Sequence, residues 1–181
     1  HRPRLVVMVS STRVYAETDG GWVDEDSAMS VDDERAVAII EAERLLLSSQ
    51  QHATIVRFGG IYGDPGGRLL AKIRRGHHAP EPPPRHTNRI HRDDCAGFLI
   101  HLLKISLAGQ PLEPAYNGVD NDPATAHEVE SWIANTLGCK AAPSDVTAAN
   151  RPTNHKRCRN DRLRASGYQL RYPDYRAGYT K

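Results

Sequence analysis

Hydroxyl side chains gather where an apolar segment ends, and a tyrosine follows a short distance later. Residues 5–9 read LVVMV, Ser10, Ser11 and Thr12 come next, and Tyr15 stands four residues after Ser11. A short, continuous apolar run is typical of a strand buried on both faces of a parallel sheet. Hydroxyls at the carboxyl end of such a strand can bind a ligand, or they can cap the turn that follows. The residues alone leave both roles open.

A second apolar segment, residues 53–58, ends in the glycine pair Gly59 and Gly60, and Ile61 follows. In parallel sheets, ligands bind outside the carboxyl ends of the strands. If the two apolar segments lie side by side and point the same way, Ser11 and the Gly59 turn meet over one crevice. We expect that crevice to be the reaction site.

Histidines in and near a proline-rich segment raise the question of a metal site. They are His77, His78, His86 and His91. Their spacings match no standard zinc pattern, so we expect no metal site. The three cysteines are widely scattered, which favours reduced thiols in a cytoplasm over a disulfide framework. They are Cys95, Cys139 and Cys158.

The composition predicts a globular chain, because 39% of the 181 residues are hydrophobic and 25% are charged. No run approaches the roughly 18 consecutive apolar residues of a membrane helix, and no signal-peptide pattern is present. The net charge is only +2, but residues 151–181 hold nine Lys or Arg against two Asp. Such a basic tail can bind nucleic acid. We expect a solvated surface instead, because no zinc ligands, repeat or helix-turn-helix pattern accompanies the charge.

The elements that would position these residues alternate between strand and helix. Strands are expected over residues 5–9, 53–58 and 115–119, and helices over residues 33–49, 68–75, 93–107 and 126–137, with a short helix stopped by Gly167. Asp32 or Asp33 and Thr125 are the predicted caps of the first and last long helices. This order predicts an α/β fold with a parallel sheet. Apolar residues nearly encircle helix 33–49, which indicates burial or a surface shared with a second copy in a homodimer.

Several segments, in order along the chain, match the motifs of one family. They read VSSTRVYAETDGGWVDEDS, TIVRFGGIYGDPGG, NRIHRDDCAGFLIHLL, YNGVDNDPATAHEVESWIANTLG and CRNDRLRASGYQLRYPDYRAGY. The first four resemble the extended short-chain dehydrogenase/reductases, in which a catalytic Ser or Thr lies four residues before a Tyr. The last resembles the tail of an atypical, YeeZ-like branch of the NAD-dependent epimerase/dehydratase family.

The resemblance implies a truncated, Rossmann-like, doubly wound parallel sheet with a small substrate-binding lobe. The C-terminal part of the NAD(P)-binding domain would comprise residues 1–60 and 92–119, and the lobe would comprise residues 61–91 and 120–181. NAD or NADP is the implied cofactor, and a nucleotide-sugar or similar small molecule is the implied substrate. The chain begins at His1 and lacks the GxxGxxG turn that approaches the pyrophosphate. We therefore expect it to be the C-terminal part of a longer protein, with little affinity for the cofactor by itself.

The same resemblance assigns roles to particular residues. Ser11 would be the catalytic hydroxyl. Substrate contacts are expected from Tyr15, Arg89 and His91, and cofactor contacts from Ser10, Gly59, Gly60 and Ile61. Asp93, which follows them at a helix start, is expected to be the helix cap.

One departure from the family bears directly on the chemistry. Counting from Ser11 places Arg35 and Ile39 where the family carries its catalytic Tyr and Lys. Arg stays protonated and Ile has no titratable group, so neither exchanges protons at neutral pH. The prediction of an NAD(P)-dependent oxidoreductase of the epimerase/dehydratase type therefore has an alternative, a catalytically degenerate binding or redox-sensing module.

Overall fold

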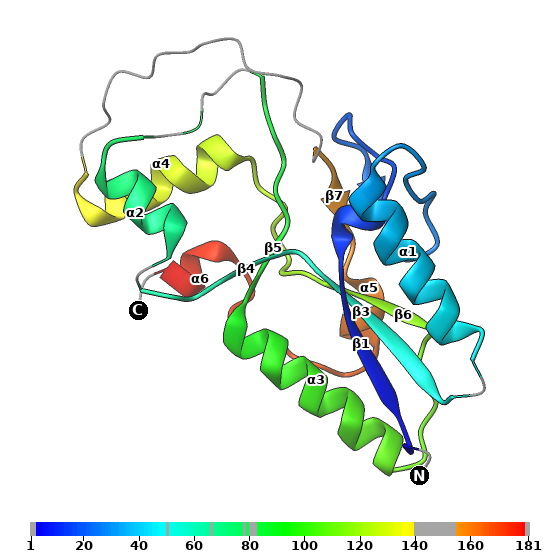
Figure 1. The fold of residues 1–181 in the computed structure, drawn as a ribbon. Helices are drawn as coiled ribbons and strands as arrows, with labels where there is room; N and C mark the ends of the chain where they lie inside the picture. Colours follow the sequence, from blue (N-terminus) through cyan, green and yellow to red (C-terminus); the bar gives the residue numbers. More distant parts are fainter. Residues whose placement is uncertain are drawn as a thin grey trace.

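A parallel sheet of three strands forms the centre of the computed structural model, which describes residues 3–49, 51–65, 67–77, 79, 83–139 and 155–179 (Figure 1). The strand order is β1 (Val6–Ser11), β3 (Ala53–Phe58) and β6 (Ala115–Gly118). Strands β1 and β3 are parallel, and their register pairs Val6 with Ala53 and Ser11 with Phe58. The expected α/β fold is confirmed, and the two strands lie side by side with Ser11 next to the residue that precedes Gly59.

The long helices begin and end close to their predicted bounds. They are α1 (Glu34–Leu47), α3 (Arg92–Leu107) and α4 (Ala126–Leu137). Asp33 caps α1 by accepting bonds from the backbone N–H groups of Arg35 and Ala36. Thr125 and Glu128 form a reciprocal capping box on α4, which satisfies two backbone donors at the helix start. Both caps are those that the sequence predicts.

The start of α3 corrects one prediction. Its N-cap residue is His91, whose Nδ1 atom accepts the backbone N–H of Asp93 at 3.2 Å. Asp93 therefore lies in the first turn of the helix and not at the cap. A carboxylate in that position still stabilises the helix through its dipole.

Several short elements complete the fold, and of these the sequence predicts only the helices α2 (Arg68–Arg74) and α5 (Asp161–Ala165). Strand β4 (Gly60–Tyr62) pairs with β5 (Arg89–His91), and β2 (Trp22–Val23) pairs with β7 (Arg157–Cys158), both in parallel. A 3-10 turn, η1 (Thr12–Val14), follows β1, and the short helices are α2, α5 and α6 (Tyr175–Tyr179). Strands of two or three residues are too short to show an alternating pattern, so the sequence does not reveal them.

The main hydrophobic core lies on the side of the sheet that α3 and α5 cover. Its buried members include Val56, Phe58, Phe98, Leu102, Tyr116 and Leu163. Helix α1 packs on β1 and β3 but buries few of its residues, and Leu45 remains 59% exposed. The expectation that α1 is buried within this chain is therefore wrong, because its apolar residues surround the axis and only one face meets the sheet. Its role in a homodimer stays a prediction.

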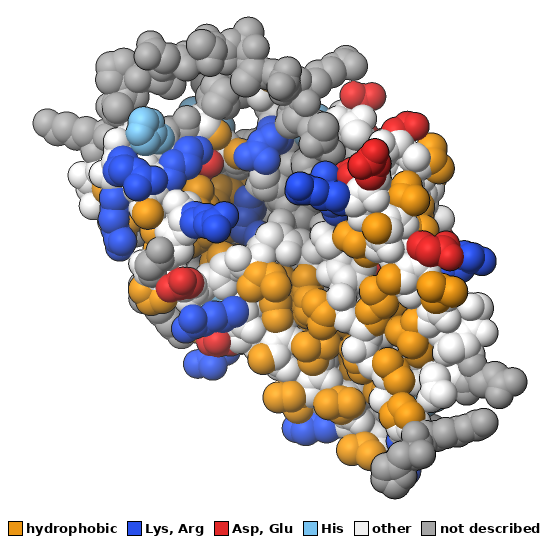
Figure 2. Space-filling model, in the orientation of Figure 1, with side chains coloured by type: hydrophobic (Ala, Val, Ile, Leu, Met, Phe, Trp, Pro, Cys, Tyr) orange, Lys and Arg blue, Asp and Glu red, His pale blue; other side chains and the backbone are white. Residues whose placement is uncertain are grey.

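Exposed apolar side chains gather on one part of the surface. Figure 2 shows them over β1 and α3, where Val9 is 55% exposed and Leu107 is 65% exposed. Strand β1 is the edge strand of the described sheet, so one side of its backbone faces outward. Within the described residues, no helix is long and apolar enough to cross a membrane.

Candidate functional site

Ser11 lies at the carboxyl end of β1 and caps the turn that follows. Its side-chain oxygen accepts the backbone N–H of Arg13 at 3.2 Å. The capping role that the sequence left open is therefore present. A hydroxyl that accepts one bond still has a proton to donate, so this cap does not prevent Ser11 from binding a ligand.

Behind the turn, a buried ion pair ties β1, β3 and α1 together. The Arg57 guanidinium donates to Glu43 at 2.7 Å, and both side chains are 3% exposed. Ser10 also donates to Glu43, with 2.5 Å between the oxygen atoms. The Ser10 hydroxyl thus donates its proton to a buried carboxylate, and its contact with a cofactor stays a prediction.

Tyr15 belongs to the same buried network. Its hydroxyl donates to Asn117 Oδ1 at 2.6 Å and accepts from Arg57 Nη1 at 3.1 Å, and the residue is 2% exposed. Burial raises the pKa of this phenol, although the adjacent guanidinium opposes the shift. The structure therefore commits the Tyr15 hydroxyl to the core, and it does not present that group to a substrate.

The glycine turn after β3 approaches protein backbone closely. Gly59 donates its N–H to Gly118 O at 3.1 Å, and Gly60 donates to Asn88 O at 2.8 Å. A Cβ atom on Gly59 would lie 2.9 Å from the carbonyl carbon of Asn88. Glycine is needed here because β5 passes directly beside the turn. Ile61, in contrast, is 57% exposed, so its side chain and Gly60 are available to a ligand.

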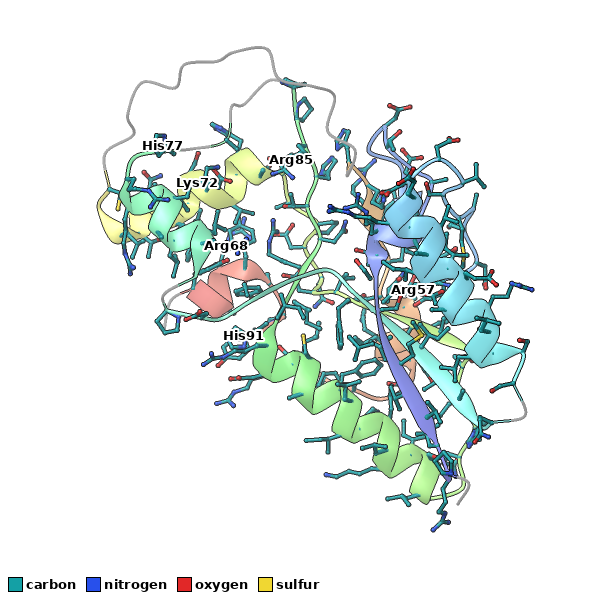
Figure 3. All side chains as sticks on the ribbon, in the orientation of Figure 1. Arg57, Arg68, Lys72, His77, Arg85 and His91 are labelled. Carbon is teal, nitrogen blue, oxygen red and sulfur yellow. The ribbon has the colours of Figure 1, made fainter. Side chains whose placement is uncertain are left out.

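A cavity of about 480 Å³ opens beside this turn, and we call it the arginine cavity. Its walls come from β4, α2, the segment leading to β5, and α4. The lining residues used below are Gly60, Ile61, Arg68, Arg85, Asn88 and Arg89. Figure 3 shows Arg68 and Lys72 on α2 and Arg85 on the segment that leads to β5.

The charged side chains in and beside the arginine cavity differ in their partners, and Lys72 reaches the cavity only through Glu130, which lines it. Lys72 pairs with Glu130 at 2.8 Å. Arg89 is 7% exposed and donates to Thr87 and to the carbonyl of Asp122. The guanidinium groups of Arg68 and Arg85 have no hydrogen-bond or ion-pair partner within the described part of the chain. They can therefore bind an anion without giving up an internal contact.

His91 is enclosed by aromatic rings and has a structural role at this site. Its ring centroid lies 3.8 Å from that of Tyr172 and 5.2 Å from that of Tyr62. Burial lowers the pKa of the His91 imidazole. The ring caps α3 and is 6% exposed, so the structure gives His91 no surface for the substrate contact that the resemblance implies.

A second cavity lies at the start of α1, with a volume of about 590 Å³. Arg35 lines it together with Arg13 and Asp33, which form an ion pair at 2.6 Å. Arg35, which the resemblance places at the position of the family's catalytic tyrosine, therefore faces an open space. Ile39 packs instead against the cluster of Val14 and Tyr15.

Metal binding finds no support in the described ranges, which contain no group of three His, Cys, Asp or Glu side chains arranged to hold an ion. His78, one of the histidines considered from the sequence, lies outside the described residues.

Arg68, Arg85 and Asn88 were not singled out from the sequence as binding residues. In the sequence, the one indication of a binding role is their position near the glycine turn and in or near the His-rich segment. This position does not distinguish them from other surface residues.

Comparisons with known proteins agree with the fold. A structure assigned as an NAD-dependent epimerase/dehydratase from Methylobacillus flagellatus is 39% identical, with a TM-score of 0.79, over 97% of this chain and 62% of that chain. A conserved protein of unknown function from Silicibacter pomeroyi is 29% identical, with a TM-score of 0.80, over 97% of this chain and 64% of that one. A human epimerase family protein solved with NADPH is 26% identical, with a TM-score of 0.77, over 98% and 64%.

A curated relative, the 3-diazoavenalumate denitrifying reductase of a Streptomyces species, is 29% identical over 182 residues, which is 86% of this chain and 57% of that protein. No protein-family model matches the chain. The chain thus spans about three fifths of the length of the proteins it matches. The similarities confirm the resemblance drawn from the motifs: this chain has the Rossmann-like fold of NAD-dependent epimerase/dehydratase proteins.

Proposed function

We propose that the protein is an NAD(P)-dependent oxidoreductase that acts on a small anionic molecule bound in the arginine cavity. The observation that carries the proposal is the pair of unpartnered guanidinium groups, Arg68 and Arg85, in a cavity bordered by Gly60 and Ile61. Arginine binds carboxylate and phosphate groups through paired N–H donors. A cofactor at the carboxyl ends of β1 and β3 would then lie beside a substrate whose charged end is held by these arginines.

The residues at the strand ends fit a dinucleotide only in part. The N–H groups of Gly59 and Gly60 are used inside the fold, so this turn would contact the cofactor through exposed Gly60 and Ile61. Ser11 would bind the reacting oxygen of the substrate through its free hydroxyl proton. The dinucleotide supplies hydride transfer when bound, and this chain's residues bind and orient the substrate.

The division into two parts also belongs to this proposal. Residues 1–60 and 92–119 would form part of the NAD(P)-binding domain, and residues 61–91 and 120–181 would form the substrate lobe. The arginine cavity supports the lobe assignment, because its walls come from β4, α2, β5 and α4. Helix α5, however, packs on β6 of the central sheet, so the C-terminal segment contributes to both parts.

Two classes of substrate suit the cavity. The resemblance implies a nucleotide-sugar, which carries phosphates. The curated relative is named for a reaction on an organic acid, and the lining here is largely apolar, with Leu69, Leu70 and Val129 beside the arginines. Both classes of substrate carry an anionic group. Measuring the binding of one nucleotide and one organic acid shows which class the cavity prefers.

We expect Arg85→Gln to weaken binding of an anion at least tenfold, which corresponds to about 1.4 kcal/mol, because a charge-assisted bond is lost. The full-length gene product would be titrated with NADPH and NADH by fluorescence, and then with UDP or 4-hydroxycinnamate by calorimetry. Arg75→Gln is the matched control, because Arg75 is exposed at the end of α2 and does not line the cavity. Absence of dinucleotide binding at millimolar concentration would remove the oxidoreductase proposal.

The alternative, a degenerate binding or redox-sensing module, is favoured by Arg35 and Ile39 at the positions of the catalytic pair. Turnover measurements separate the two functions. In an enzyme, Ser11→Ala should lower kcat at least tenfold, because the substrate loses a hydroxyl donor that polarises it. If dinucleotide binds with no turnover of carbonyl or nucleotide-sugar substrates, and Ser11→Ala leaves that binding intact, the sensing module is the better description.

A further inference from the structure

The segment that follows the last gap in the described chain crosses the molecule between the two cavities, and we call residues 155–160 the strap. On one side it contacts the loop after Tyr15: Gly20 donates its N–H to His155 O at 2.7 Å, and Arg157 donates to Gly21 O at 2.9 Å. On the other side, the Asn88 side chain donates to Lys156 O at 3.0 Å and accepts from Cys158 N at 2.7 Å. Asn88 lines the arginine cavity, so the strap supports a wall of that cavity.

The His155 ring contacts two other parts of the chain, the His86 ring and Gly20. On one face it stacks on His86, with 5.3 Å between ring centroids and 10° between the planes. Gly20 also lies close to the ring: it has a φ of +87°, and a Cβ at this position would be 2.7 Å from His155 Nε2. Both the backbone conformation and the space require glycine there. The His155 ring therefore occupies the space that a side chain at position 20 would need.

One hydrogen bond fixes the protonation state of this ring. The backbone N–H of His86 donates to His155 Nδ1 at 2.9 Å. An N–H can only donate, so Nδ1 must be unprotonated and His155 must be the neutral tautomer with its proton on Nε2. The His86 ring, in turn, donates from Nδ1 to the carbonyl of Pro123 at 3.0 Å.

Protonation of His155 would break this arrangement. The new proton on Nδ1 would oppose the N–H of His86, and the positive ring would stack on a second imidazole. Burial, His86 and Arg157 lower the pKa of His155, while Asp19 and Glu17 raise it, and the net direction is downward. Glu128 on α4 faces the His86 side of the pair. The neutral form is therefore the one that the folded chain favours.

We propose that His155 is a positioning residue that acts as an acid-sensitive latch: neutral, it holds the rim of the arginine cavity, residues 85–88, against the strap, and protonated, it releases that rim. The inference rests on the proposed function only in treating the cavity as the substrate site. The latch is closed above the lowered pKa of His155 and opens as the pH falls through it. Arg85 and Asn88, which lie within the rim, lose their fixed positions when it opens.

The test uses two substitutions that separate hydrogen bonding from titration. His155→Asn places an amide oxygen near the position of Nδ1 and accepts the same N–H at every pH. His155→Leu removes the acceptor altogether. In the full-length, ¹⁵N-labelled protein, the wild-type His86 amide should shift and lose protection from exchange as the pH falls from 7.5 to 5.5. The Asn variant should stay protected throughout, and the Leu variant should be unprotected at both ends.

Ligand binding is measured on the same variants over the same pH range. Binding of UDP or 4-hydroxycinnamate should weaken at least threefold in the wild type at pH 5.5 and should change less in the Asn variant. The latch is overturned if His155 titrates with no response at the His86 amide, or if the Leu variant keeps that amide protected at pH 7.5. The amide signals are measured without a ligand. They therefore test the latch even if the arginine cavity turns out not to bind a substrate. The wild-type titration also decides it if the Leu variant does not fold.

Discussion

Replacing Glu43 by glutamine should lower the free energy of unfolding by about 3–5 kcal/mol, because the substitution leaves the Arg57 charge buried without its counter-charge. Both side chains are 3% exposed, and Arg57 makes bonds of 2.7 to 3.2 Å to the two carboxylate oxygens. Ser10 loses a charged acceptor in the same substitution. The effect is large because water cannot replace the missing charge inside the fold.

Chemical denaturation of the wild type and the variant measures this difference. The matched control is Glu41→Gln on the same helix, which breaks an exposed ion pair with Arg44 and should leave stability essentially unchanged. The double replacement Glu43→Met with Arg57→Met should be less damaging than Glu43→Gln alone, since it leaves no unpaired charge. Equal effects of Glu43→Gln and Glu41→Gln would show that the buried pair does not hold β3 to α1.

Asp120→Asn should remove a pH dependence of stability that the wild type carries. Asp120 follows β6, is 2% exposed, and its Oδ2 atom has no hydrogen-bond partner within the described part of the chain. Burial raises its pKa from 3.8 to about 8, with Arg89 opposing the shift and Asp122 and Asp174 adding to it. The folded chain therefore keeps this carboxyl protonated at neutral pH.

The direction of the effect follows from which state binds the proton. Between about pH 4 and pH 8 the folded state holds a proton that the unfolded state has lost, so rising pH favours unfolding. One such proton costs about 1.4 kcal/mol of stability for each pH unit. Asparagine is neutral at every pH, and the difference between the two stability curves should show this slope and level off above about pH 8.

Urea denaturation at several pH values between 5 and 9 gives both curves. Asp26→Asn is the control, because its side chain is 75% exposed and its ion pair with Arg162 lies at the surface, where such pairs contribute little. That variant should follow the wild-type curve. Parallel stability curves for the wild type and Asp120→Asn would mean that the Asp120 carboxyl is ionised in the folded protein. That result would contradict the prediction drawn from the buried, unpartnered Oδ2 atom.

Much of the fold was predictable because its signals are local. The strand at Ala53–Phe58 has the predicted bounds, and the capping box at Thr125 is present as expected. Gly167, expected to stop the short helix α5, has a φ of +88°, a conformation that glycine adopts without strain. The adjacency of Ser11 and the Gly59 turn also followed, because parallel order in an α/β sheet leaves few alternatives.

The candidate site was only partly predictable. The sequence indicated that a tyrosine and a serine stand at a strand end, but it did not show that Tyr15 turns inward to Asn117 and Arg57. Nor did it connect Arg68 with Arg85, which reach one cavity from different segments. Side-chain direction at a strand end depends on packing partners distant in the chain, and no periodicity records them.

The sequence by itself determined the order of the longer strands and helices, the caps of α1 and α4, and the family that the chain resembles. These features depend on the spacing of apolar residues and on side chains that bond to backbone within a few positions. Only the tertiary structure decided which polar groups are buried and which face a cavity, because that choice depends on contacts across β1, β3 and the strap. The arginine cavity and the His86–His155 pair are products of those contacts.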